Sequence, residues 1–174
     1  MPSEIESHFK NYNVETLSLS DMSFYRSDFI SKFISMNKSD FHALSLTRVH
    51  FDEHIKDLAD YLKSGDTKIT KIVLHDCDIG DTNLTQMLAD CSNLDKLKEL
   101  HLVKMNMQEH MREIIKYLLD HKSLKILDLS NNELKNMNSV SEFLARNQVI
   151  KKLNIKGNPI LHENDLRNLL FGLT

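Results

Sequence analysis

The stretch LKILDLSNNEL, residues 124–134, decides how this chain folds. Leucine or isoleucine stands at its first, third, fourth, sixth and eleventh positions, and asparagine stands at its ninth. Its fourth and sixth positions are apolar and flank a polar residue. This alternation is typical of a short strand with one buried face, because side chains point to opposite sides in extended chain. The stretch therefore predicts a strand followed by a turn.

The same pattern recurs along the chain. Matches begin at residues 14, 41, 69, 97, 124 and 150, so successive starts lie 27, 28, 28, 27 and 26 residues apart. A nearly constant period of this length is the signature of a repeat architecture. After each strand the apolar residues change to helical spacing, as in Met111, Ile114, Ile115 and Leu118. Each unit is therefore predicted to be one strand, one turn and one helix.

Stacking these units determines the expected shape. Strands in a sheet lie about 4.8 Å apart, whereas packed helices need about 8 to 10 Å between axes. The stack must therefore bend, with parallel strands on its inner face and helices on its outer face. We expect residues 14–174 to form this repeat domain and residues 1–13, with Ile5, Phe9 and Tyr12, to cap its first unit.

The far end of the chain leaves three alternatives open. Residues 169–173 are rich in apolar side chains, more than one final helix needs to face inward. The last helix could cap itself, the open end could form a dimer, or a downstream region could be missing. We favour the self-capping helix and expect a monomer.

The pattern LxxLxLxxNxL with a period near 28 resembles the leucine-rich repeats of the ribonuclease-inhibitor type over residues 14–174. This resemblance implies an α/β fold: a right-handed solenoid of six repeats with parallel strands on the concave face and helices on the convex face. In that family the asparagine side chain bonds backbone groups of adjacent turns. Asn132 and Asn158 match this position, and Cys77 is a substitute often found there.

The departures from the family pattern are at residues 22, 49 and 105, which are Met, Val and Met. Those units must satisfy their turn backbones by other means. The low glycine and proline content, with abundant Asn, Lys and Ser, is similar to secreted leucine-rich-repeat effectors of intracellular bacteria such as Legionella. The resemblance implies a protein-binding module located in the cytoplasm, or in the host cytosol if it acts as an effector on a host protein.

Composition excludes several classes of function. The net charge of −3, with histidines neutral, gives no overall attraction to nucleic acid or to an anionic membrane. Cys77 and Cys91 have no zinc-motif spacing and are expected to be free, structural thiols. No signal-peptide-like run opens the chain, and no stretch approaches 18 uninterrupted apolar residues. We expect no nucleic-acid partner and no membrane insertion.

The candidate binding surface is the expected concave face. Side chains between the buried strand positions should reach it. The candidates are Lys71, Val73, His75, Glu99, His101, Val103, Ile126, Asp128, Lys152 and Asn154. Its apolar members, Val73, Val103 and Ile126, could form a patch for a protein partner. They could equally be β-branched residues that stabilise strands.

Lysines gather in the last three units. They are Lys98, Lys104, Lys125, Lys151, Lys152 and Lys156. Only Glu99 and Asp128 oppose them on the expected face, which favours an acidic partner. Alternatively, lysines on the last strand would block unwanted strand addition. Single-stranded nucleic acid is not favoured because these positions hold no Phe, Tyr or Trp for base stacking.

On the rim of turns that follow the strands, Tyr25 and Arg26 are the best candidates for hot-spot residues in partner binding.

Catalysis has little support in the sequence. His75 and His101, in adjacent units, could approach one another near acidic residues, but a metal site needs at least three converging ligands. Four isolated glycines make no phosphate-binding loop. We therefore predict a non-enzymatic protein with no catalytic residue, metal or cofactor. The alternative is the targeting part of a larger catalytic protein whose enzyme domain lies outside this chain.

Ser139 and Glu142 also predict a capping box at one helix.

Overall fold

The computed structural model describes residues 14–24, 42–51, 55–63, 67–91, 94–108, 110–135, 137–159, 164 and 167. Within these ranges the chain is an α/β protein with one six-stranded sheet and four helices. The strands are β1 (Thr16–Phe24), β2 (Ala43–Phe51), β3 (Lys71–His75), β4 (Glu99–Val103), β5 (Ile126–Asp128) and β6 (Lys152–Asn154). The helices are α3 (Ile55–Lys63), α4 (Asp81–Cys91), α5 (Met111–Leu118) and α6 (Asn138–Arg146).

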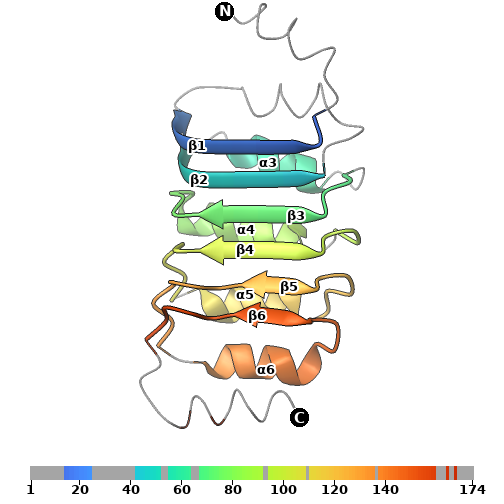
Figure 1. Cartoon of the computed structure of the whole chain (residues 1–174), viewed down its shortest axis with the longest axis vertical. Helices are drawn as coiled ribbons and strands as arrows, with labels where there is room; N and C mark the ends of the chain where they lie inside the picture. The colour runs from blue at the N-terminus through green and yellow to red at the C-terminus, as the bar shows by residue number, and fades with distance from the viewer. Residues whose placement is uncertain are drawn as a thin grey trace, which may run out of the picture.

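The strands lie in the sheet in chain order, β1 to β6, and every neighbouring pair is parallel. Figure 1 shows α3, α4 and α5 behind the sheet and α6 beyond its β6 edge, and no described element crosses the front of the sheet. We call this front the open face. Its outward strand residues are Thr16, Ser18, Ser20, Ala43, Ser45, Thr47, Lys71, Val73, His75, Glu99, His101, Val103, Ile126, Asp128, Lys152 and Asn154.

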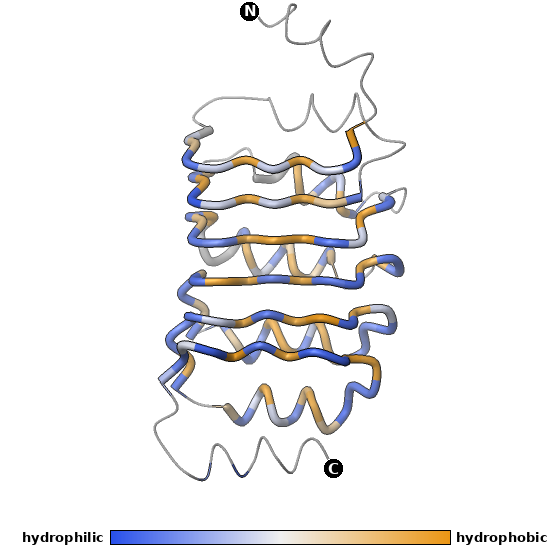
Figure 2. Tube along the Cα trace, viewed as in Figure 1, coloured by the Kyte–Doolittle hydropathy of each residue, from blue (hydrophilic) through white to orange (hydrophobic). Residues whose placement is uncertain are grey.

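The core lies between the sheet and the helices. Leu44, Leu74 and Leu100, which alternate with open-face residues, are at most 1% exposed. Figure 2 shows apolar residues recurring along the strands and along the helices behind them. Burial of one leucine side chain contributes about 1.5 to 3 kcal/mol. The predicted alternation in strands and the predicted apolar stripe of α5 are confirmed.

The backbone makes the same turn at a fixed distance from the start of each strand. Five residues beyond the first residue of every strand, φ is positive, with values between 49° and 73°. These residues are Asp21, Arg48, Asp76, Lys104, Asn131 and Gly157. A left-handed conformation is unfavourable for residues other than glycine. Its recurrence at one place means that the same tight turn occurs within β1 and β2 and after β3, β4, β5 and β6.

Asn132 joins neighbouring turns, as its place in the pattern predicts. It is fully buried. Its Oδ1 accepts the N–H of Met105 at 2.7 Å. Its Nδ2 donates to the carbonyl oxygens of Leu102 at 2.6 Å and Ser130 at 3.2 Å. One side chain therefore satisfies three buried backbone groups across two units.

Asn158 repeats this arrangement one unit later. Its Oδ1 accepts the N–H groups of Asn132 at 2.8 Å and Leu134 at 3.1 Å. Its Nδ2 donates to the carbonyl oxygen of Leu129 at 2.9 Å. The predicted role of both asparagines is confirmed.

Sulfur atoms take over this role toward the amino terminus. Cys77 lies at the equivalent position, and its thiol donates to the carbonyl oxygen of Leu46 at 3.4 Å. The Met105 thioether accepts the N–H of Cys77 at 3.5 Å. Thioether and thiol are weak hydrogen-bonding groups. Of the other departures, Val49 is buried, whereas Met22 is 41% exposed.

One local prediction was wrong. Helix α6 begins at Asn138, its N-cap is Met137, and no side-chain hydrogen bond caps it. Ser139 therefore lies inside the helix and makes no capping box with Glu142. Met137 is fully buried, so packing against the core sets the point at which the helix begins.

Several expectations lie outside the described residues. They include the cap formed by residues 1–13, the first helix, the rim residues Tyr25 and Arg26, and the apolar end at 169–173. Within the described ranges, no helix has the length and apolar character required to cross a membrane.

Candidate functional site

All ten predicted concave-face residues lie on the open face of β3 to β6, and each is at least partly exposed. Register arranges them in rows that run across the strands. One row runs from Lys71 through Glu99 and Ile126 to Lys152. A second runs from Val73 through His101 and Asp128 to Asn154. A third pairs His75 with Val103. Parallel in-register pairing therefore decides which of these side chains are neighbours.

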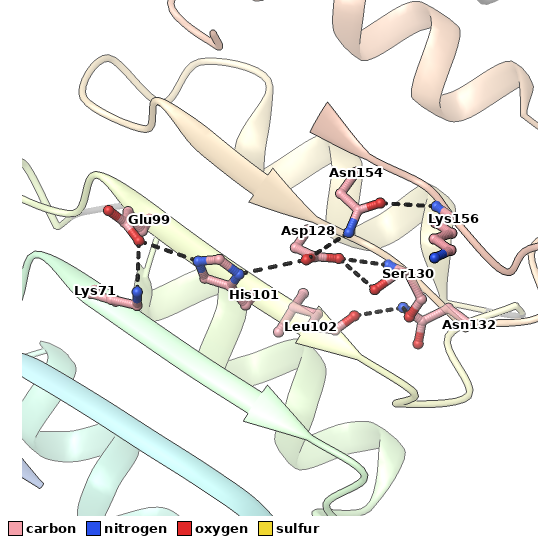
Figure 3. Close-up of polar contacts among 9 residues, drawn as sticks. All are labelled: Lys71, Glu99, His101, Leu102, Asp128, Ser130, Asn132, Asn154 and Lys156. Atoms are coloured by element: carbon pink, nitrogen blue, oxygen red, sulfur yellow. Dashed lines mark hydrogen bonds and ion pairs between the residues drawn. The ribbon is translucent and has the colours of Figure 1, made fainter. Parts of the chain in front are cut away.

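A chain of polar contacts links the first two rows (Figure 3). The Nζ of Lys71 lies 3.0 Å from Oε2 of Glu99. The same oxygen accepts a hydrogen bond from Nε2 of His101 at 3.3 Å. On its other side, Nδ1 of His101 lies 3.7 Å from Oδ2 of Asp128. His101 is thus held between carboxylates from two strands.

Asp128 is the most firmly held of these groups. Its Oδ1 accepts the N–H of Ser130 at 2.9 Å and the hydroxyl of Ser130 at 2.7 Å. Its Oδ2 accepts the side-chain amide of Asn154 at 2.9 Å. Burial raises the pKa of Asp128, but the hydrogen bonds from Ser130 and Asn154, together with nearby His101, lower it below its ordinary value. The carboxylate therefore stays ionised and oriented at neutral pH.

Glu99 has the same electrostatic character. The hydrogen bond from Lys71 lowers its pKa, partial burial opposes that effect, and the contact with His101 lowers it further. Two ionised carboxylates and two basic side chains therefore alternate across β3, β4 and β5. This arrangement fixes the positions of donors and acceptors before any ligand binds, which reduces the entropy lost on binding.

The apolar residues are not gathered into one band. Val73 stands opposite His101, Val103 stands opposite His75, and Ile126 stands opposite Glu99. The three lie in different rows, so none of them stands directly opposite another. Each has a polar residue as its direct cross-strand partner.

The two histidines considered for a metal site have different surroundings. His75 lies in the row of Val103, whereas His101 contacts Glu99 and Asp128. The part of the chain that the structure describes contains no group of three or more His, Cys, Asp or Glu arranged to hold a metal ion.

The left-handed turn positions carry ion pairs that sequence reasoning missed. The Nε and Nη2 of Arg48 lie 2.5 and 2.8 Å from the two carboxylate oxygens of Asp21. The Nζ of Lys104 lies 2.8 Å from Oδ2 of Asp76. The signal was present in the period, because these four residues share one repeat position and alternate in charge. These contacts lower the pKa of Asp21 and of Asp76.

A pocket of about 270 Å³ lies beside the turns after β3 and β4, and Cys77, Lys104 and Met105 contribute to its wall. Burial raises the pKa of Cys77. Burial also raises the pKa of Cys91, to about 12. Both cysteines are buried and free, as predicted, and both thiols are protonated at neutral pH, which argues against a nucleophilic role.

Comparisons with known proteins found no protein-family model and no curated protein that matches this chain.

Proposed function

We propose that the chain is a leucine-rich-repeat module of the ribonuclease-inhibitor type, with six units stacked into a curved solenoid. Three observations support this proposal: parallel strands in chain order, one left-handed residue at a fixed distance from the start of each strand, and the bonds of Asn132 and Asn158 between adjacent turns. Because helices are thicker than strands, the stack bends away from the helices. The open face is then its concave side.

We further propose that this face binds another protein and that the module is not itself an enzyme. The observation that carries the proposal is the ordered set of cross-strand contacts from Lys71 through Glu99 and His101 to Asp128, on a face that no described element covers. Such a face presents fixed charges and hydrogen-bonding groups over a broad area. Broad, ordered surfaces with few deep pockets suit protein partners.

The polar and apolar residues of the open face would have different roles in recognition. The polar contacts give direction and specificity, because a mismatched partner would leave charges unpaired. Val73, Val103 and Ile126 would offer the partner apolar contacts at positions between these polar groups. The open-face strand positions carry no Phe, Tyr or Trp, which are common hot-spot residues. The aromatic anchors of the interface would therefore come from the partner.

The test compares capture of partners from a host-cell lysate by three forms of the protein. The face variant is V73D/I126D, which adds two negative charges to the open face. The matched control is A145D/Q148D, which adds the same two charges at exposed positions in and just after α6. Circular dichroism establishes that all three forms fold.

We expect quantitative mass spectrometry to identify a protein that wild type and the control retain equally and that the face variant recovers at least tenfold less. Equal recovery by all three forms would reject binding through the open face.

A further inference from the structure

A column of three lysines crosses the amino-terminal edge of the sheet. The N–H of Lys98 donates to the carbonyl oxygen of Thr70, that of Lys125 to Lys98, and that of Lys151 to Lys125, each at 2.8 Å. Neighbouring strands lie about 4.8 Å apart, so the three side chains start from backbone positions that span only about 10 Å. We call Lys98, Lys125 and Lys151 the lysine column.

Among the residues that the structure describes, the lysine column has no acidic counterpart. None of the carboxylates in the described part of the chain forms an ion pair with any of its three members. Lys98 and Lys151 are exposed, and Lys125 is half-buried. Like charges side by side on neighbouring strands are destabilising.

The opposite edge of the same sheet shows that this repulsion is avoidable. There, Asp21 pairs with Arg48 and Asp76 pairs with Lys104, so charges of alternate sign stand on consecutive units. The lysine column departs from this arrangement over β4, β5 and β6.

Protection of the sheet edge does not account for the column. Lys151 directly precedes β6, the last strand of the sheet, where lysines hinder strand addition. Lys98 and Lys125 precede β4 and β5, and each of these strands is paired on both sides. Two of the three lysines therefore require another explanation.

We propose that the lysine column is the docking site for an acidic segment of a protein partner, which lies across the amino-terminal ends of β4, β5 and β6. This inference rests on the proposed protein-binding function and specifies the chemistry of the partner. Carboxylates placed along the column replace repulsion between lysines with ion pairs. Exposed Lys152, which follows Lys151, extends the same basic surface.

Charge and composition favour a protein over other polyanions. The net charge of −3 opposes long-range attraction to nucleic acid or to anionic membranes. The strand positions of the open face have no aromatic residue on which bases could stack. An acidic protein segment needs only local charge complementarity, which sets specificity and the association rate and is screened by salt.

The test is a titration of the full chain, labelled with nitrogen-15, with a hexaglutamate peptide at low salt. We expect the largest chemical-shift changes at the amides of the lysine column. The variant K98Q/K125Q/K151Q should bind the peptide at least tenfold more weakly. The matched control K63Q/K116Q/K135Q removes three exposed lysines elsewhere and should lose less than twofold. Equal losses in both variants would show an effect of net charge alone and would overturn the proposal.

A single substitution gives a second readout if the triple variant folds poorly. K125E places a carboxylate between Lys98 and Lys151, so it should raise the melting temperature at low salt and weaken peptide binding. The rise should disappear in 1 M salt, where the Debye length falls to about 3 Å. A lower melting temperature together with unchanged peptide binding would contradict the proposal.

Two further comparisons define the partner class. Tighter binding of a hexathymidylate strand or of anionic lipid vesicles than of hexaglutamate would overturn the choice of a protein. A captured partner that depends on Val73 and Ile126 but is fully retained by K98Q/K125Q/K151Q would refute the lysine column and leave the proposed function intact. Peptide binding at the column without any partner that depends on the open face would support the docking site and reject the broader proposal.

Discussion

His121 is buried at the turn before β5, where its ring accepts backbone hydrogen bonds. Its exposed fraction is 4%. Its Nδ1 accepts the N–H of Leu124 at 3.2 Å, so the ring is neutral and carries its proton on Nε2. Burial lowers the pKa of His121. Asn147 has the same role as a hydrogen-bond acceptor before β6, because its Oδ1 accepts the N–H of Ile150 at 3.1 Å.

This arrangement predicts a dependence of stability on pH. The folded pKa of His121 lies below the unfolded value of about 6.5. The unfolded chain therefore binds the proton more readily than the folded chain. Protonation of His121 in the unfolded chain lowers the free energy of unfolding as the pH falls below about 6.5. Urea unfolding at pH 7.5 and 5.5 should show a smaller loss of unfolding free energy for H121N than for wild type. Asparagine keeps the hydrogen-bond acceptor, as at Asn147, but does not titrate. Equal losses in wild type and H121N would contradict this role.

The lowered pKa values of Glu99 and Asp128 act in a different range. Both carboxylates are ionised in the folded and unfolded states above pH 5, so their contribution is lost only at lower pH. The comparison between pH 7.5 and 5.5 is therefore free of their effect.

Asn132 allows a second prediction at the scale of one residue. N132A would leave the N–H of Met105 and the carbonyl oxygen of Leu102 without their partner inside the core. An unsatisfied buried polar group costs about 1 to 3 kcal/mol, so we expect N132A to lower the free energy of unfolding by about 3 kcal/mol. N132C, which copies Cys77, should cost less. Urea denaturation measures both, and a cost below about 1 kcal/mol for N132A would be inconsistent with the bonds described.

At the scale of elements, the left-handed turn is the feature that recurs with each strand. Non-glycine residues tolerate its left-handed conformation at five of the six strands, and the turn after β6 uses Gly157, with φ of 73°. A Cβ at Gly157 would collide with the side-chain oxygen of Asn131. Glycine is therefore favoured there by the close approach of the Asn131 side chain as well as by backbone conformation.

We predict that G157A lowers the free energy of unfolding by about 2 kcal/mol, from left-handed strain and the collision together. G80A is the matched control, because Gly80 has φ of 76° but its nearest atom is the Asn83 amide at 3.6 Å. G80A should cost only the conformational term, about 1 kcal/mol. Combining G157A with N131G should recover part of the difference. Equal costs for G157A and G80A would exclude the collision.

At the scale of the whole molecule, the proposed solenoid predicts an elongated shape. A compact domain of 174 residues has a radius of gyration of about 16 Å. A curved solenoid is longer than a globule of equal mass, so small-angle X-ray scattering of the monomer should give a larger value. A value at or below about 16 Å would count against the proposed solenoid.

Much of the fold could be predicted because it is repeated local information. Alternating apolar residues such as Leu100 and Leu102 specify a strand with one buried face, and Met111, Ile114 and Ile115 specify the stripe of a helix. The ten face residues followed from the same alternation. The start of α6 could not be predicted, because burial of Met137 outweighed a favourable capping sequence.

By itself, the sequence determined the period, the order of strands and helices, the residues that are buried and those that reach the open face. Only the tertiary structure decided which side chains from different units meet. His101 contacts Glu99 and Asp128 rather than His75, the apolar trio is dispersed, and the lysine column is assembled from three units. The physical reason is that alternation and period are properties of one unit, whereas lateral neighbours depend on the register in which successive strands pair.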